Sequence, residues 1–369
     1  MSQEIIQALA FSIPATCALT CMGVVLMDVF HPDKNRQARQ LRLFLMLTYA
    51  VAALCWTGLI FQVAIPKTFV HYQPVFFFTL MMDQVLIYRF VHIITSVRER
   101  DRFNLLHFIV PVALTTLLTI SMLVIPFEQR QTILYNAGVG MGNWWYGVLN
   151  HLSGVVFIVF NTFYPILGLR RIWRYRREIV NYSADTQRTS LNWLFIMQLL
   201  TLITIPIPLA GMLLNMEVFN NTWSSMQGVL PTFFVYPILC YNLLSDNYEI
   251  MKLGDESPSD KLPAIDPKRF DKYLKDKQPY LNQRIHISDF ASALYSNSKY
   301  VSVYINNTYG MNFNRFINHC RLTELDRLRK SPQMKNRDNM ELILMTGFSN
   351  YRSYLRAKEA QDKERVLNF

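Results

Sequence analysis

Residues 223–244, WSSMQGVLPTFFVYPILCYNLL, form an apolar stretch that ends where the chain turns polar. The stretch contains no Lys, Arg, Asp or Glu, whereas the tail after residue 245 is rich in all four. About 20 apolar residues of helix are needed to cross the roughly 30 Å hydrocarbon core of a bilayer, because no water there can bind exposed backbone groups. The sequence therefore predicts a membrane domain up to residue 245, followed by a polar domain outside the bilayer.

Six more stretches of spanning length precede this one, at residues 5–27, 43–64, 72–96, 104–126, 144–169 and 190–214. Apart from histidines, the charged residues inside all seven are only Asp83 and Arg89, although the chain holds 37 Lys and Arg and 26 Asp and Glu. A soluble helical core would not exclude charge so completely. We expect an all-α protein whose residues 1–245 form a seven-helix transmembrane bundle, with a kink at Pro206 and Pro208 in the sixth helix.

The loops between these stretches differ strongly in charge. Alternate loops hold thirteen basic residues, namely Lys34, Arg36, Arg39, Arg42, Arg98, Arg100, Arg102, Arg170, Arg171, Arg174, Arg176, Arg177 and Arg188. The opposite loops hold only Lys67 and Arg130. Lys and Arg near short loops are retained on the cytoplasmic side. We therefore expect a multi-pass protein of the cytoplasmic (inner) membrane, in contact with membrane lipid, with its amino terminus outside and its carboxyl terminus in the cytoplasm.

Three further features narrow the class of protein. No basic region precedes the first stretch, so we expect it to be retained and not cleaved as a signal peptide. The five cysteines match no paired metal-ligand spacing, so neither zinc nor disulfides are expected. The chain also lacks a Gly-rich phosphate loop, a metalloprotease motif and histidine-kinase elements. We expect no metal, no cofactor and no enzymatic activity.

The tail divides into a linker and a helical domain. Residues 246–267 carry Gly254, Pro258 and Pro263 among scattered charges, which is typical of a linker. In residues 268–369 the apolar spacing predicts a first helix that ends at Pro279 and further helices at 287–294, 297–309, 314–329, 340–346 and 350–360. Residues 284–358 hold 12 Lys and Arg against 5 Asp and Glu, an excess that suits a phosphate-facing surface.

Two pairs of short helices in this domain are joined by tight turns. Asn297 is a plausible N-cap for the second helix of the first pair, and Gly310 ends that helix. The stretch ISDFASALYSNSKYVSVYINNTYGMNFNRFINHCRL (287–322) closely resembles the first half of the AraC-type DNA-binding domain. Residues 340–356, which end in GFSNYRSYLR, resemble its second helix-turn-helix. The resemblance covers about 95 residues and says nothing of the membrane part.

The resemblance implies two recognition helices that enter successive major grooves of double-stranded DNA. The base-facing positions that it implies are Lys299, Ser302, Val303 and Asn306 in the first helix, and Tyr351, Arg352 and Arg356 in the second. Arginine can bind guanine through two parallel hydrogen bonds, which suits Arg352 and Arg356. The chain departs from the family at Ile343, where the family mostly has alanine, at Lys358, where it has an aromatic residue, and at its carboxyl end.

These features together predict a membrane-embedded one-component transcriptional regulator that forms a homodimer. The bundle would receive an unknown small-molecule or protein signal, and Asp83, Arg89 and His92 are the candidate signal-site residues. Asp83 and Arg89 lie about 240° apart around their helix, so they cannot pair with each other. The alternative is a membrane receptor or scaffold whose degenerate helix-turn-helix domain binds a protein partner instead of DNA.

Overall fold

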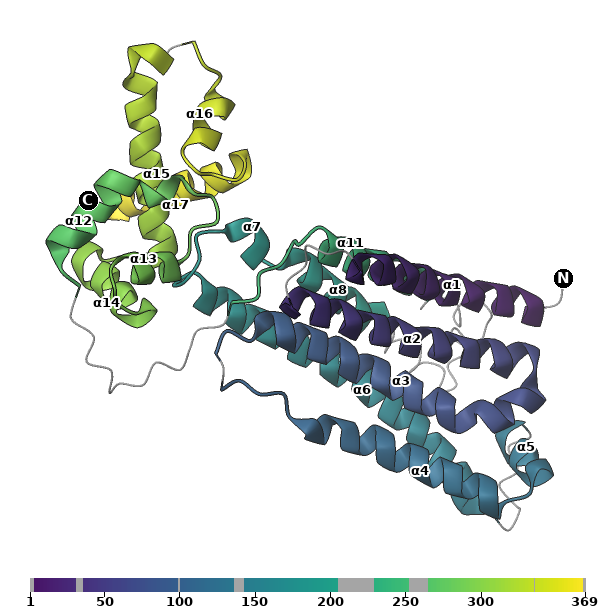
Figure 1. Cartoon of the computed structure of the whole chain (residues 1–369). Helices are drawn as coiled ribbons and strands as arrows, with labels where there is room; N and C mark the ends of the chain where they lie inside the picture. Colours follow the sequence, from purple (N-terminus) through teal and green to yellow (C-terminus); the bar gives the residue numbers. More distant parts are fainter. Residues whose placement is uncertain are drawn as a thin grey trace. The chain divides into compact units, whose positions relative to one another are not determined.

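The computed structural model describes residues 3–30, 36–98, 100–135, 143–204, 229–251, 265–334 and 336–367. All regular structure in these ranges is helical, with no strand, as expected of an all-α protein. The chain divides into two compact units (Figure 1). The first comprises Met1–Thr95, Arg102–Ile172 and Asn192–Asn247, and the second comprises Ser96–Asp101, Trp173–Leu191 and Tyr248–Phe369. The second unit thus contains a segment from within the predicted membrane domain.

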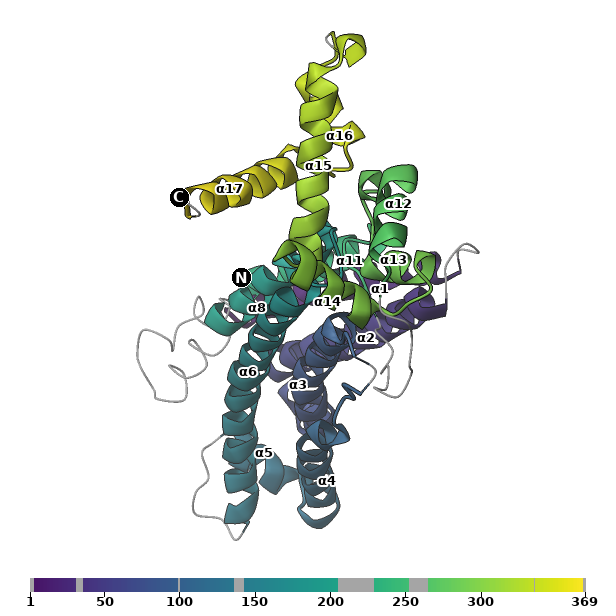
Figure 2. The same cartoon turned by 90° about the vertical axis from the view of Figure 1, so that its left-hand side faces the viewer.

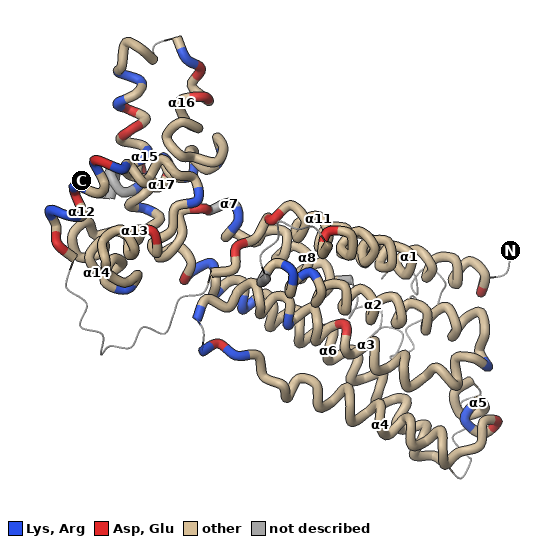
Figure 3. The backbone as a smooth tube through the Cα atoms, in the orientation of Figure 1, with Lys and Arg blue, Asp and Glu red and all other residues tan. Residues whose placement is uncertain are grey.

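The first unit contains five helical segments long and apolar enough to cross a membrane. They are α1 (Gln3–Val29), α2 (Arg36–Ala64), α3 (Pro66–Thr95), α4 (Ile109–Val124) with the preceding 3-10 turn Leu105–Phe108, and α6 (Trp144–Ile179). These helices confirm the apolar helical character of the first five predicted spans. Figures 1 and 2 show α1, α2 and α3 side by side, with α2 in contact with both neighbours. Figure 3 shows how few charged residues lie along them.

Two shorter apolar helices correspond to the described parts of the sixth and seventh predicted spans. They are α8 (Asn192–Thr204) and α11 (Val229–Leu244). Pro206 and Pro208, where a kink is predicted, lie outside the described residues. A short helix, α5 (Phe127–Tyr135), follows α4. The structure therefore describes a multi-pass membrane protein, and the orientation of its spans stays a prediction from the loop charges.

The first unit exposes many large apolar side chains on its outside and buries several polar ones among its helices. Large apolar side chains such as Leu123 and Leu230 are 85% and 68% exposed, whereas the polar Asn161 and Gln198 are buried. Apolar side chains lose nothing by facing lipid tails, but a polar side chain in hydrocarbon needs a hydrogen-bond partner inside the bundle. Gln73 of α3 meets this need by bonding to Tyr146 and Asn150 of α6.

Arg42, one of the thirteen loop cations, is fully buried at the start of α2. Its guanidinium donates to the carboxylate of Asp28 at the end of α1 and, over 3.3 Å, to Asp246 after α11. A third hydrogen bond, 3.1 Å long, reaches the Ala38 carbonyl. A buried charge is tolerated only when it is paired in this way. Arg42 therefore joins the facing ends of the consecutive helices α1 and α2 to the end of α11, which is far away in the sequence.

The second unit contains the polar helices of the tail. They are α12 (Pro267–Lys277), α13 (Ile287–Ala293), α14 (Ser298–Tyr309), α15 (Phe313–Lys330), α16 (Asn339–Met345) and α17 (Tyr351–Leu367). The predicted helices are all present, but α17 continues past the expected end at Ala360, because the charged sequence after it consists largely of good helix formers. Gly254, Pro258 and Pro263 of the predicted linker lie outside the described residues.

Candidate nucleic-acid interface

The first helical pair, α13 and α14, is fixed by its caps. Asn297 accepts a 2.9 Å hydrogen bond from the Tyr300 backbone at the start of α14, as predicted. Gly310 ends the helix in the left-handed conformation, with φ of 69°, which favours glycine. Val301 and Ile305 are fully buried on one face of α14. The turn and the buried face together determine which side of α14 remains exposed.

That remaining side carries the positions implied by the family resemblance. Lys299, Val303 and Asn306 are exposed, and Ser302 is half-buried. These four positions recur at helical spacing, so they share one side of α14. The arrangement places a cation, an amide and a hydroxyl where a ligand can reach them. Val303, 47% exposed, is the apolar member of this surface.

The second pair, α16 and α17, repeats the arrangement. Asn350 accepts a 2.9 Å hydrogen bond from the Ser353 backbone at the start of α17. Tyr354 and Ala357 are buried, whereas Tyr351, Arg352 and Arg356 are exposed. Arg352 and Arg356 make no salt bridge among the described residues. All three predicted positions are therefore accessible on α17.

The turn between α16 and α17 packs against residues 280–283. Gly347 has φ of 90°, and a Cβ atom there would lie 2.5 Å from the Tyr280 carbonyl oxygen, so only glycine fits. Arg321 of α15 donates 2.8 Å hydrogen bonds to the carbonyls of Tyr280 and Asn282, and its guanidinium lies 5.7 Å from the Phe348 ring. Burial lowers the pKa of Arg321 to about 10, so it remains a cation. Arg321 thus holds the two helical pairs together.

The two positions at which the chain departs from the family pattern, Ile343 and Lys358, both fit the second helical pair. Ile343 is fully buried in a core formed by α15, α16 and α17, where it packs with Leu325 and Phe348. The larger side chain is accommodated within a core that includes Tyr354. Lys358, in contrast, is exposed on α17. Neither residue interrupts the second helical pair.

Sequence reasoning missed the contact between the tail and the segment that follows α6. The Asn314 backbone donates to the Val180 carbonyl over 3.1 Å, and its side-chain amide donates to the Ser183 carbonyl over 3.1 Å. A pair of backbone hydrogen bonds follows, from Ala184 to Ile285 over 3.3 Å and from Ile287 to Tyr182 over 3.0 Å. We call residues 180–185 the docking loop. It contacts α15 and the entry to α13.

The docking loop also contributes to the core of the first helical pair. Ala184 is buried in the cluster that contains Phe270, Phe290 and Phe313, and Tyr182 packs against this cluster. The residue types at positions 182 and 184 do not predict this contact, because the hydrogen bonds that hold the loop are mainly between backbone groups. The basic loop after α6, whose arginines predict a cytoplasmic position, therefore also contributes to the core of the second unit.

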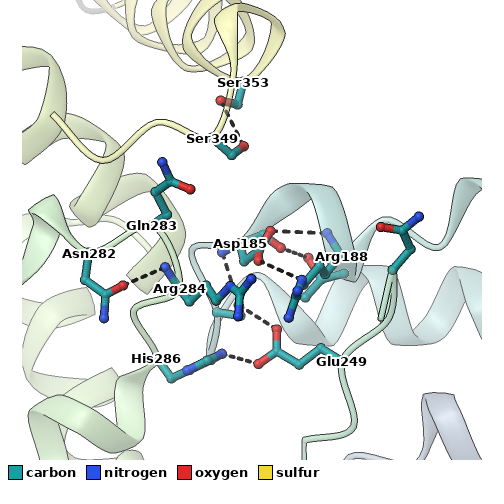
Figure 4. A network of polar contacts seen from close by, with 12 residues as sticks. Asp185, Arg188, Glu249, Asn282, Gln283, Arg284, His286, Ser349 and Ser353 are labelled. Atoms are coloured by element: carbon teal, nitrogen blue, oxygen red, sulfur yellow. Dashed lines mark hydrogen bonds and ion pairs between the residues drawn. The ribbon is translucent and has the colours of Figure 1, made fainter. Parts of the chain in front are cut away.

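An ion pair extends this contact. Figure 4 shows the His286 side chain pointing at the carboxylate of Glu249, with which it pairs. Ser183 donates a 3.4 Å hydrogen bond to the same carboxylate. Burial of His286 opposes its charged form, but the hydrogen bond and charge of Glu249, aided by Asp289 and Asp185, outweigh burial and raise the pKa of His286. Glu249 lies within the predicted linker, so at least the start of that segment is held in place.

The candidate signal-site residues all lie on α3. Asp83 has a buried carboxylate oxygen, Oδ1, with no hydrogen-bond partner among the described residues. A buried carboxylate oxygen without a hydrogen-bond partner is costly in a membrane helix, so we keep Asp83 as a candidate for a role beyond packing.

Arg89 and His92 are brought together by an aromatic residue that sequence reasoning did not single out. The Arg89 guanidinium lies 5.4 Å from the rings of both Phe44 and Phe103, and the buried His92 ring meets Phe103 edge-on at 5.5 Å. Contact with two aromatic faces stabilises a cation that water does not surround. The structure therefore joins Arg89 to His92 through Phe103, and Asp83 is not part of that group.

Comparisons with protein-family models, curated proteins and solved structures found no match to this chain. In the part of the chain that the structure describes, the protein is all-α, with about five long apolar helices in its amino-terminal part and a helical carboxyl-terminal region.

Proposed function

We propose that the chain is a membrane-embedded one-component transcriptional regulator with an AraC-type DNA-binding domain. The observation that carries the proposal is the exposure of equivalent sides of α14 and α17, each following a capped turn in a helix-turn-helix pair. In such pairs the second helix enters the major groove. Polar and basic side chains on its outer side then meet base edges and phosphates.

The two helices would divide the recognition of double-stranded DNA between them. Lys299 and Asn306 on α14 and Arg352 on α17 have side chains that hydrogen-bond to base edges, and arginine pairs best with guanine. Each good bidentate pair contributes about 1 to 3 kcal/mol of discrimination against the wrong base. Ser302 and Tyr351 can bind phosphate or sugar, which fixes the register. Val303 would contact a thymine methyl group.

The docking loop offers a route from the bundle to the DNA-binding helices. α6 leads directly into this loop, and the loop holds α15 and the entry to α13 through the backbone hydrogen bonds described above. A signal that alters α6 would change these contacts and hence the DNA-binding helices. The signal would be a small molecule or a protein, and we propose Asp83, Arg89 and His92 as residues that respond to it. Homodimer formation is part of the same proposal, because operators commonly contain two half-sites.

The experiment that tests the DNA proposal uses the full-length protein in lipid nanodiscs. Selection from a random duplex pool should enrich a defined motif, and the affinity for that motif should fall as salt rises. The double variant Lys299→Ala/Arg352→Ala should lose the motif, whereas the control Lys275→Ala, an exposed cation on α12, should retain it. Recovery of the same motif by the double variant would contradict the proposal.

One observation favours a second candidate, a membrane scaffold that binds a protein through the same surface. Val303 and Tyr351 are each 47% exposed on the proposed recognition sides, and exposed aromatic and aliphatic residues are common at protein interfaces. In that case the nanodisc selection would yield no motif at any salt concentration, while alteration of Val303 or Tyr351 would abolish capture of the protein partner.

A further inference from the structure

The last turns of α6 have two sides of different character. Tyr175 and Ile179 are buried on one side, whereas Trp173, Arg174 and Arg177 are exposed. The three exposed positions fall within about 100° of the helix circumference, so they share one side of α6. We call these three residues the juxtamembrane stripe, because they follow the apolar part of the helix. The end of α6 thus presents one aromatic ring and two cations on a single exposed side.

The cations at this end of α6 differ in their partners. Arg176, outside the stripe, donates to the Ser190 carbonyl, and Glu178 pairs with Arg98 over 3.0 Å. Among the described residues, neither Arg174 nor Arg177 makes a hydrogen bond or an ion pair. The Arg177 guanidinium instead lies 3.5 Å from the centroid of the Trp173 ring. The stripe therefore holds two guanidinium groups that no carboxylate of the described chain neutralises.

The length of α6 relates the stripe to the bilayer surface. Trp144, at the start of the helix, is 66% exposed, and Trp173 is 52% exposed. The two tryptophans are 29 residues apart, or about 44 Å along a helix that rises 1.5 Å per residue. A bilayer with its headgroup regions is about 40 to 45 Å thick, and exposed tryptophans are enriched at both of its surfaces. If Trp144 lies at one surface, the stripe lies among the headgroups of the other.

The chemistry of the stripe fits one component of that surface. Guanidinium groups bind phosphate oxygens through paired, charge-assisted hydrogen bonds. Contact with an aromatic face stabilises the Arg177 cation and holds it near the ring. Ile166, seven residues before Trp173 and therefore on the same side of α6, is exposed and offers an apolar surface to an acyl chain. We infer that the juxtamembrane stripe binds the headgroup of an anionic phospholipid on the predicted cytoplasmic side.

Such binding would act directly before the docking loop. α6 ends at Ile179, and the docking loop begins at residue 180. A lipid bound to Arg174 and Arg177 would hold the last turn of α6, and with it the start of the loop that contacts α15 and the entry to α13. The anionic lipid content of the membrane would then influence the helices proposed to bind DNA. This regulatory consequence rests on the proposed function, whereas the binding of lipid does not.

The test measures lipid binding to the full-length protein in a neutral detergent. Native mass spectrometry during titration with phosphatidylglycerol or phosphatidylcholine should show a preference for the anionic lipid. Arg174→Gln/Arg177→Gln should weaken phosphatidylglycerol binding by about tenfold or more, because each cation near an anionic headgroup contributes about fivefold in affinity. Two controls, Arg39→Gln on α2 and Lys275→Gln/Lys277→Gln on α12, remove exposed charges elsewhere and should bind this lipid like the wild type.

Circular dichroism should give the same helix content for all four proteins, so that a binding defect reflects the stripe and not unfolding. Equal affinity of the wild type for the two lipids, or equal losses in the stripe variant and the controls, would overturn the inference. Inorganic phosphate should not displace phosphatidylglycerol at constant ionic strength, and displacement would assign the stripe to a dissolved phosphate instead. If the nanodisc selection finds no DNA motif while the lipid preference depends on Arg174 and Arg177, the DNA proposal fails and the lipid site stands.

Discussion

Glu249 forms an ion pair with His286 at the entry to α13. The two residues come from different parts of the tail, one close after the last apolar helix and the other in the first helical pair. Ser183 of the docking loop shares the Glu249 carboxylate. This ion pair therefore joins the docking loop, the chain that leaves α11 and the helices proposed to bind DNA.

The ion pair predicts a pH dependence of stability. The pKa of His286 is raised above its ordinary value of 6.5 in the folded protein, with Glu249, Asp289 and Asp185 as the facing carboxylates. Folding therefore favours the protonated form, and the stabilisation is complete below about pH 6.5 and is lost as pH rises through the raised pKa. Thermal unfolding of the full-length protein in detergent, followed by circular dichroism, should show this loss. The decrease of the melting temperature with rising pH should become smaller in Glu249→Gln. It should persist in Asp276→Asn, which alters an exposed carboxylate on α12. Equal slopes in both variants would refute the assignment.

Removal of the Asn314 side-chain amide should loosen the docking loop. Asn314→Ala leaves the Ser183 carbonyl without this donor, and an unsatisfied buried polar group costs about 1 to 3 kcal/mol. We expect faster hydrogen exchange at the backbone amides of Ala184 and Ile287, measured by mass spectrometry. Asn307→Ala, an exposed asparagine on α14, is the control. Unchanged exchange in Asn314→Ala would mean that the backbone hydrogen bonds alone hold the loop.

The buried Arg42 should matter more to the bundle than Arg39, the exposed loop cation one turn earlier on α2. Arg42→Ala removes the cation that pairs with the Asp28 carboxylate, and breaking a buried ion pair costs about 3 to 5 kcal/mol. The amount of membrane-inserted protein and its thermal stability should both fall. Arg39→Ala removes an exposed charge one turn earlier on α2 and should be nearly neutral. Similar behaviour of the two variants would show that Arg42 is not a structural cation.

Substitution of Asp83 distinguishes a signalling role of this residue from a packing role. If the carboxylate serves a switching contact, Asp83→Asn should retain membrane insertion, because it removes a buried charge, while it alters the transcriptional response. Membrane-inserted protein and target transcripts should be measured together, with and without the inducing condition. Normal abundance with a wild-type response would exclude Asp83 from the mechanism.

The loop charges predict the topology, which reporter fusions can test. Fusions after residues 36, 100, 176 and 260 should report the cytoplasm, and fusions near residues 68 and 135 should report the outside. A carboxyl-terminal unit on the external side could not reach DNA. An external signal at residue 260 would therefore contradict both the topology and the proposed function.

The sequence predicted features that local chemistry determines. Asn297 and Gly310 bound α14 because an N-cap side chain and a left-handed C-cap each have a characteristic residue type. The long apolar helices were predictable for a similar reason, since a bilayer imposes both length and composition. In the candidate DNA surface, alternating buried and exposed positions on α14 and α17 followed from helical periodicity.

The features that the sequence did not predict depend on tertiary contacts. The docking loop is held by backbone amides and carbonyls of Tyr182, Ala184 and Ile287, which every sequence supplies. In the sequence Arg42 cannot be distinguished from the exposed Arg39, because its partners Asp28 and Asp246 come close only in the folded chain. A cleft between α15 and α17 likewise forms only when these helices pack, because the residues that line it lie far apart in the chain.

Chromatin immunoprecipitation of the full-length protein in its native cells is the most direct test of the central claim, which is that a membrane-embedded chain reads DNA. The wild-type protein should enrich a small set of genomic sites that share a motif. The double variant Lys299→Ala/Arg352→Ala, present in the membrane at the same level, should lose that enrichment. Absence of any enriched site for the wild type, or identical sites for the variant, would contradict the claim.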